Sequence, residues 1–295
     1  MNVYEIITDR IIKELESGII PWEKPWVNTS GTNVARSHND GRIYSILNQM
    51  CIGMPGEYAT FKQVSAEKGT VKKGAKSSPI FFWSMMKKEV KDKDGNVKMK
   101  DGQPVMNSIP FLKYYSVFHL EDTENIKPKY VFSQGHVAEN APIAEIDKAV
   151  ADYVARANGL TIRNYEQGRS FYRPASDEII LPHPWQFKNP ESYYATLFHE
   201  LGHSTGTEER CNRKMGGHFG DEEYSAEELV AEITSAVLCN HFGIDTSKIQ
   251  RNTAAYIQNW LSVLKNDSKM VVGAAGKAEK AVKLILNIKE GSDKQ

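Results

Sequence analysis

The chain has 295 residues, of which 40% are hydrophobic, so it can bury a sizeable core and is not expected to be disordered. Its 37 basic and 37 acidic residues cancel, which excludes a uniformly basic protein that coats nucleic acid. The balance is uneven along the chain, because the stretch from Lys62 to Lys100 holds 11 basic residues against 4 acidic ones.

The cysteines and the hydropathy pattern indicate a reducing compartment. Cys51, Cys211 and Cys239 are odd in number and far apart, so the sequence predicts neither a disulfide framework nor a cysteine zinc cluster. Charges interrupt the apolar residues at the N-terminus, and no apolar run reaches the length of a membrane helix. We therefore expect a cytoplasmic protein without a signal peptide, a membrane span or a membrane partner.

The first part of the chain predicts helices and one β-hairpin. Apolar residues from Tyr4 to Leu15 recur at helical spacing, and Gly18 is typical of the position after a helix. The prolines around Trp22 and Trp26 favour a loop across the surface. The segment between two β-rich stretches is polar and has two Asp-Gly turn signals, which indicates a hairpin with a long tip. The two short helices are expected over 44–51 and 60–68, and the hairpin strands over 79–83 and 109–120.

The second part of the chain predicts a few strands followed by helices. Its expected helices and strands cover residues 143–157, 161–163, 170–173, 178–181, 191–204, 225–242, 253–264 and 276–288. This order is typical of an α+β fold. Residues 126–142 are polar, lack periodicity and contain prolines, so we predict a linker there between a domain over 1–125 and a domain over 143–295.

The run from His199 to His203 reads His-Glu-Leu-Gly-His. In a helix, residues four apart share a face, so both imidazoles can bind one ion while Glu200 lies beside them. Two imidazoles leave positions on a tetrahedral Zn²⁺ for a third protein ligand and a water, whose pKa falls to about 7 when bound. Glu200 would accept the proton of that water and deliver it to the leaving amine. The motif predicts a gluzincin-like, zinc-dependent peptidase, although Mn²⁺ or Co²⁺ could occupy such a site.

A third metal ligand is expected from the helix over 225–242. We predict Glu228, because Glu232, one turn later, could then accept a hydrogen bond from a liganding histidine. Glu227 is the nearest alternative, and His218 would make an all-imidazole site.

Two further features concern the substrate. Tyr224, one turn before Glu228, could aim its hydroxyl at an oxyanion, although a buried structural tyrosine is an equal alternative. The strand over 178–181 lies just upstream of the metal helix, where a sheet edge could hold an extended peptide by main-chain hydrogen bonds.

The segment 192–206, with Tyr224 and 227–232, resembles the zincin-like metallopeptidase domain of the ArdC-type antirestriction proteins. The N-terminal part resembles the single-stranded-DNA-binding domain of the same family. This resemblance implies a protein of plasmids or other mobile elements that protects incoming DNA. Thr207 stands where the family usually has histidine. Asn39-Asp40 precedes Gly41 where the family usually has a small or proline-containing segment. Neither departure changes a metal ligand. The matching N-terminal segments are 19–26, 41–48, 60–63, 71–76 and 115–118.

Single strands are bound by basic grooves that follow the phosphates and by aromatic rings on which bases stack. The N-terminal part has both residue types but no visible base-reading motif, so we expect a structural preference and strong salt dependence. The residues predicted to contact DNA are Trp22, Trp26, Arg36, Arg42, Tyr44, Lys62, Lys72, Lys73 and Lys76, with Phe61 and Trp83 as further rings.

These features support two functional hypotheses. The first is an active metallopeptidase that binds single-stranded DNA and cleaves a restriction enzyme or another DNA-associated protein. The second is a non-proteolytic protein that shields DNA or binds a restriction enzyme, with a structural or vestigial metal site. The presence of Glu200 favours the first, because a purely structural site needs no such base. A nuclease is a weaker alternative, since nuclease sites usually hold two ions among carboxylates.

Overall fold

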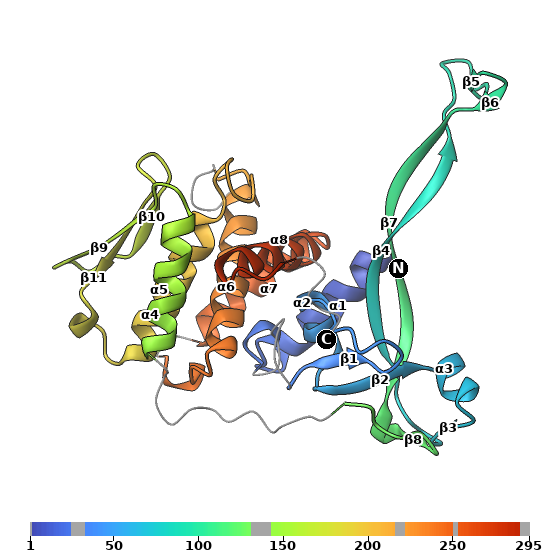
Figure 1. Ribbon diagram of the computed structural model, residues 1–295, viewed down its shortest axis with the longest axis horizontal. Helices are drawn as coiled ribbons and strands as arrows, with labels where there is room; N and C mark the ends of the chain where they lie inside the picture. Colours follow the sequence, from blue (N-terminus) through green and yellow to red (C-terminus); the bar gives the residue numbers. More distant parts are fainter. Residues whose placement is uncertain (1, 25–32, 131–142, 216–221, 250–252, 290–295) are drawn as a thin grey trace.

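The computed structural model describes residues 2–24, 33–130, 143–215, 222–249 and 253–289 (Figure 1). Helices and strands are mixed, which confirms the expected α+β fold. Its α-helices are α1 (Val3–Glu16), α2 (Ile46–Ile52), α3 (Phe61–Ala66), α4 (Ile143–Arg156), α5 (Pro190–Ser204), α6 (Glu222–His241), α7 (Thr253–Asn266) and α8 (Met270–Ile285). Its strands are β1 (Ala35–Ser37), β2 (Gly56–Thr60), β3 (Thr70–Val71), β4 (Ser78–Glu89), β5 (Met99–Lys100), β6 (Gln103–Pro104), β7 (Met106–His119), β8 (Thr123–Glu124), β9 (Thr161–Tyr165), β10 (Phe171–Arg173) and β11 (Glu178–Pro182).

The expected hairpin forms from β4 and β7, which pair without interruption from Ser78 opposite Val117 to Glu89 opposite Met106. It belongs to a four-stranded sheet in the order β1-β2-β7-β4, so β4 is an edge strand. Its tip, with β5 and β6, extends far beyond the rest of the molecule (Figure 1). At the tip, the Asp92 carboxylate accepts hydrogen bonds from two backbone N–H groups and so closes a turn.

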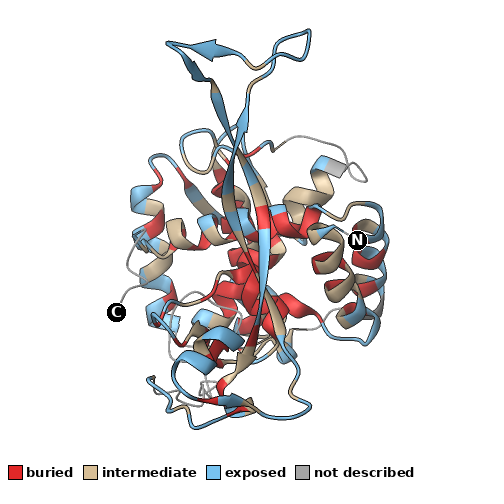
Figure 2. Ribbon diagram, turned by 90° about the vertical axis from the view of Figure 1, so that its right-hand side faces the viewer, coloured by how far each residue is buried: buried red, intermediate tan, exposed pale blue. Residues whose placement is uncertain are grey.

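Helix α1 begins with a capping box, in which the Asn2 side chain accepts from the backbone of Glu5 and the Glu5 carboxylate accepts from the backbone of Asn2. Beyond its end, Gly18 adopts a positive φ of 84°, as the sequence predicts. Its apolar stripe, including Ile7 and Ile11, is buried. These residues pack into the same core as the C-terminal helices, and the buried residues gather behind the hairpin (Figure 2).

The segment after α1 corrects the expectation of a surface loop. Trp22, in the 3₁₀ turn η1 (Pro21–Glu23), is 0% exposed. Its ring meets the ring of Trp260 edge-on at a centroid distance of 6.1 Å, and its indole N–H donates to the hydroxyl of Tyr256 over 3.2 Å. A tryptophan must bury its large ring while its N–H finds an acceptor, and α7 supplies both. The regions predicted as separate domains therefore share one hydrophobic core.

The C-terminal part contains a small sheet in the order β10-β11-β9, covered by α5. Helix α6 packs on α5 and on α8. Helix α8 begins at Met270, earlier than expected, because Gly273 breaks the helical pattern in the sequence while its apolar neighbours Val271 and Val272 are buried in the fold. No helix in the described ranges is long and apolar enough to cross a membrane.

Candidate metal centre

Helix α5 presents both histidines of the motif on one face. The Asn189 side chain accepts from the backbone N–H of Ser192 at 2.8 Å, and Pro190 follows the cap, which is a strong start signal for a helix. Gly202 lies where α5 meets α6, and a Cβ at this position would come within 3.1 Å of the Cα of Ala231. The two helices can therefore approach closely, and this approach brings a carboxylate of α6 to the histidines of α5.

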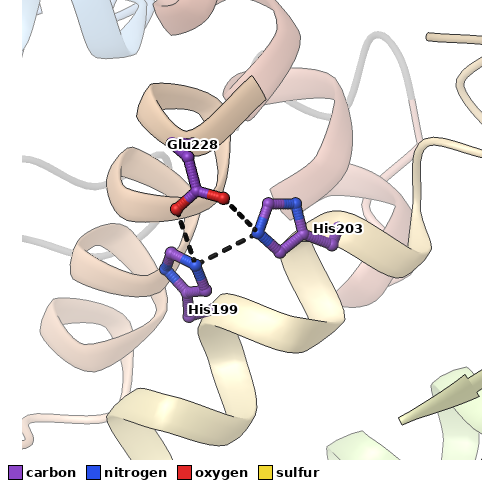
Figure 3. Close-up of side chains that lie close together, drawn as sticks. All are labelled: His199, His203 and Glu228. Atoms are coloured by element: carbon purple, nitrogen blue, oxygen red, sulfur yellow. Dashed lines mark hydrogen bonds and ion pairs between the residues drawn. The ribbon is translucent and has the colours of Figure 1, made fainter. Parts of the chain in front are cut away.

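That carboxylate belongs to Glu228, which faces both imidazoles (Figure 3). Its two oxygens lie 3.5 Å from Nε2 of His199 and 3.4 Å from Nε2 of His203. The two Nε2 atoms are 3.1 Å apart, and one ligand atom from each of the three residues lies within 4.8 Å of the others. Two imidazole nitrogens and a carboxylate around one point are a donor set that Zn²⁺ prefers, so these residues fit a divalent ion.

The other nitrogen of each imidazole faces a further carboxylate. Nδ1 of His199 is 3.7 Å from Glu232, and Nδ1 of His203 is 3.3 Å from Glu227. Partners of this kind orient a liganding imidazole and fix its tautomer, which leaves Nε2 free for the metal. The structure therefore places Glu227, the alternative ligand, behind His203. It places Glu232 near His199 but beyond hydrogen-bonding distance, and the Glu232 carboxylate accepts from the Tyr256 hydroxyl at 3.0 Å.

The electrostatics of the site favour positive charge between the carboxylates. Burial opposes charge on His203, but its bonds to Glu227 and Glu228 outweigh that effect and raise its pKa to about 10. Burial likewise opposes charge on Glu228, yet the two histidines lower the pKa of its carboxyl. A site that attracts protons this strongly is also suited to a divalent cation, which would replace them.

The predicted catalytic residues line the same cavity of about 380 Å³ as the metal ligands. Glu200 is 6% exposed, and burial raises the pKa of its carboxyl, as suits a group that must take up a proton. Tyr224 lies against Glu228, and burial together with that carboxylate raises the pKa of its phenol. Its hydroxyl is thus directed at a ligand, and its role toward an oxyanion stays a prediction.

The strand expected to hold a substrate is corrected by the sheet topology. Residues 178–181 belong to β11, which is the central strand, with β10 on one side and β9 on the other. Its main-chain groups are occupied, so it cannot pair with a peptide. The strand beside the cavity is β10, an edge strand whose Phe171 and Tyr172 line the cavity next to Glu200.

Arg213 is a site residue that the sequence analysis missed. It donates to both carboxylate oxygens of Glu227, at 2.7 and 2.9 Å, to the Thr205 hydroxyl at 2.7 Å and to the Gly202 carbonyl at 2.8 Å. It thereby fixes the carboxylate behind His203. An arginine in a polar loop carries no sequence signal for this role, because the pairing exists only once the loop folds back on α5.

Replacement of Arg213 by methionine is expected to lower the free energy of unfolding by about 3 kcal/mol, because it removes the arginine that pairs with the buried Glu227 carboxylate. Chemical denaturation measures this loss. Lys214→Met is the matched control, since the neighbouring Lys214 side chain is 83% exposed and its pair with Glu223 is on the surface. Equal stability of the two variants would contradict the role assigned to Arg213.

The predicted DNA-binding residues are distributed unevenly. One is corrected: Trp22 is in the core, so its ring offers no face on which a base can stack. Tyr44 is 7% exposed against Tyr58 but lines a cavity between β4 and α8. Arg36 is half-buried over the ring of Tyr130. Trp26, and the alternative metal ligand His218, lie outside the described residues. The exposed members are Arg42, Lys62, Lys72, Lys73 and Lys76, with Phe61 and Trp83.

The fold and the candidate metal centre define a zincin-like protein whose N-terminal part carries the long hairpin. A family model described as a zincin-like metallopeptidase matches residues 149–277, and one described as the N-terminal domain of anti-restriction factor ArdC matches residues 1–118. The metal-free crystal structure of the antirestriction ArdC protein from plasmid R388 is 30% identical, with a TM-score of 0.68, and the match covers 97% of each chain. The chain therefore belongs to the ArdC antirestriction family.

Two further comparisons bear on the metal and on the wider family. The Mn(II)-bound structure of the R388 protein has a TM-score of 0.68 and 29% identity, covering 97% of this chain and 98% of that one. A DNA primase TraC of Escherichia coli is 32% identical over 96% of this chain. The present chain spans only 27% of the length of that primase. The zincin-like domain thus implies a bound metal, as in the R388 relative.

Proposed function

We propose that this protein binds single-stranded DNA and cleaves a protein associated with it, and so protects the incoming DNA of a mobile element from restriction. The observation that carries the proposal is the position of Glu200. It is a buried carboxylate in the same cavity as the metal ligands His199, His203 and Glu228. A site that serves only to stabilise the fold needs no general base.

The residues divide the chemistry among them. His199, His203 and Glu228 would hold the ion, which when bound supplies Lewis acidity that polarises a carbonyl and lowers the pKa of a water. Glu200 would remove a proton from the attacking water and later donate it to the leaving amine. The edge of β10 would hold the peptide extended across the cavity, because β10 is an edge strand of its sheet and lines the cavity next to Glu200.

Zinc is the ion that we propose for the site. Two imidazoles and one carboxylate are a common catalytic zinc set, and the outer carboxylates Glu227 and Glu232 would increase the basicity of the imidazoles. Mn²⁺ or Co²⁺ could replace zinc, because loading also follows metal availability. The R388 relative binds Mn(II).

The proposal for DNA rests on the basic residues around the hairpin. Lys62 of α3 and Lys72, Lys73 and Lys76 between β3 and β4 are exposed near the base of the sheet. Lysines grouped in this way neutralise phosphates without reading sequence. The matching N-terminal family model and the exposed Trp83 on the hairpin support the same partner.

The alternative is a protein that shields DNA or binds a restriction enzyme without proteolysis, with the ion in a structural role. Cleavage of a single-strand-binding protein assembled on an oligonucleotide separates the two functions. We expect the zinc-loaded protein to cut that substrate faster on DNA than free, a chelator to stop the reaction, and added Zn²⁺ to restore it, because the site without its ion lacks the Lewis acid. Electrophoresis of the products measures the rate. No cleavage by the zinc-loaded protein would favour the alternative.

A further inference from the structure

A second cavity, of about 370 Å³, shares no lining residue with the metal site. It lies between the edge strand β4, the segment from Arg42 to Asn48 and helix α8. Its volume is within the range of small-ligand pockets, about 300–1,000 Å³. The cavity is therefore large enough for a planar ring system, and it lies where the N-terminal hairpin meets a helix of the C-terminal part.

The walls combine apolar rings with two charged side chains: Arg42, and Glu279, whose carboxylate accepts from the backbone N–H of Ile46 at 3.2 Å and pairs with Lys283 at 3.0 Å. Trp83 is 57% exposed, whereas its neighbour Phe82 points to the opposite face of the sheet and stacks on Tyr115 with ring centroids 4.9 Å apart. Arg42 at the rim is exposed, and among the described residues its guanidinium makes no hydrogen bond or salt bridge. Rings that can stack beside a guanidinium suit a ligand that joins an aromatic base to a phosphate.

The outer edge of β4 supplies polar groups that can recognise the rim of a base. The Asn48 side-chain amide occupies this edge at Phe81, where it donates to the carbonyl at 2.8 Å and accepts from the N–H at 2.7 Å. Because strand residues alternate, the N–H and C=O of Trp83 also face away from β7. No described residue bonds them. A nucleobase edge, with a donor beside an acceptor, could bind Trp83 as the Asn48 amide binds Phe81.

Helix α8 leaves room for such a ligand. Gly276 lines the cavity in the interior of α8, and a Cβ built there meets no atom within 4 Å. Glycine inside a helix is less favourable than alanine, so Gly276 does not stabilise α8. A larger side chain at this position would occupy the cavity.

We propose that this cavity binds one unpaired nucleobase of a DNA single strand, with the base at the outer edge of β4 beside Trp83 and a neighbouring phosphate at Arg42. The inference rests on the proposed single-strand binding and assigns it a site. In a duplex the base edges are already paired, so the cavity would select single strands. The site also places DNA against α8, which packs on the helix that carries Glu228.

The test compares Gly276→Leu with Gly273→Leu. Both glycines lie in α8 with open space at Cβ, but only Gly276 lines the cavity. Fluorescence anisotropy with a labelled mixed-sequence single strand should show binding by Gly276→Leu that is weaker by about tenfold, the loss typical of one stacked base, and unchanged binding by Gly273→Leu. Circular dichroism of both variants checks that α8 still folds.

An oligonucleotide in which every base is removed tests the chemistry without a change in the protein. Wild type should bind this abasic strand more weakly than the intact one, and Gly276→Leu should bind the two strands nearly alike. Equal binding of the intact strand by both leucine variants would show that the cavity is not the nucleobase site, while the proposed single-strand binding would stand. Equal binding of intact and abasic strands by wild type would also overturn the nucleobase site. A wild type that binds no single strand would overturn the proposed function itself.

Discussion

Replacement of Glu200 by glutamine is expected to remove the peptidase activity and to leave metal and DNA binding unchanged. Glutamine keeps the shape of the side chain but cannot take up the proton of the attacking water. Loss of a general base typically lowers the rate by about 10²–10⁴-fold. The carboxylate lies in the metal cavity but outside the set of three ligand atoms that face one point, so the ion should stay bound. Peptide cleavage, elemental analysis and DNA binding on one preparation measure the three properties.

Glu191→Gln is the matched control for this variant. Glu191 is also a buried glutamate of α5, at 7% exposure, but it pairs with Lys248 at the start of the helix, away from the cavity. The Glu191→Gln variant should cleave the peptide as wild type does. Protection of incoming DNA from restriction is the decisive second readout. If Glu200→Gln protects as well as wild type, proteolysis is not the means of protection, whatever the site can cleave in solution.

Glu228→Ala and His199→Ala are each expected to lose the ion. Wild type should hold about one ion per chain, and removal of one of three protein ligands leaves too few to compete with water. Elemental analysis of the purified proteins gives the content, and anisotropy on single-stranded oligonucleotides in the same samples should show that DNA binding survives. Glu223→Ala, on the exposed surface of α6, should keep the ion.

Two results would change the assignment of the ligands. A greater loss of metal in Glu227→Ala than in Glu228→Ala would make Glu227 the ligand, against the geometry in which it faces Nδ1 of His203. If Glu227 only orients His203, its replacement should lower the metal affinity by no more than about 10–100-fold. Absence of any ion from wild type would remove the peptidase proposal and leave a DNA-binding protein.

The sequence alone determined the elements whose signals are local. Helical spacing between His199 and His203 fixed a shared face, and the same spacing in the following helix placed Glu228 and Glu232 one turn apart. Asp-Gly turns between two β-rich stretches predicted the hairpin of β4 and β7. These patterns extend over a few residues, so no knowledge of distant contacts was needed to recognise them.

Only the tertiary structure decided which side chains lie inside and which main-chain groups are occupied. The loop expected around Trp22 is buried because α7 supplies a partner more than two hundred residues away. Strand β11 cannot pair with a substrate because β9 and β10 flank it. Arg213 belongs to the site because its loop folds back and pairs it with Glu227. Burial, sheet order and ion pairing depend on contacts between segments far apart in the chain, and a local pattern of residue types does not specify them.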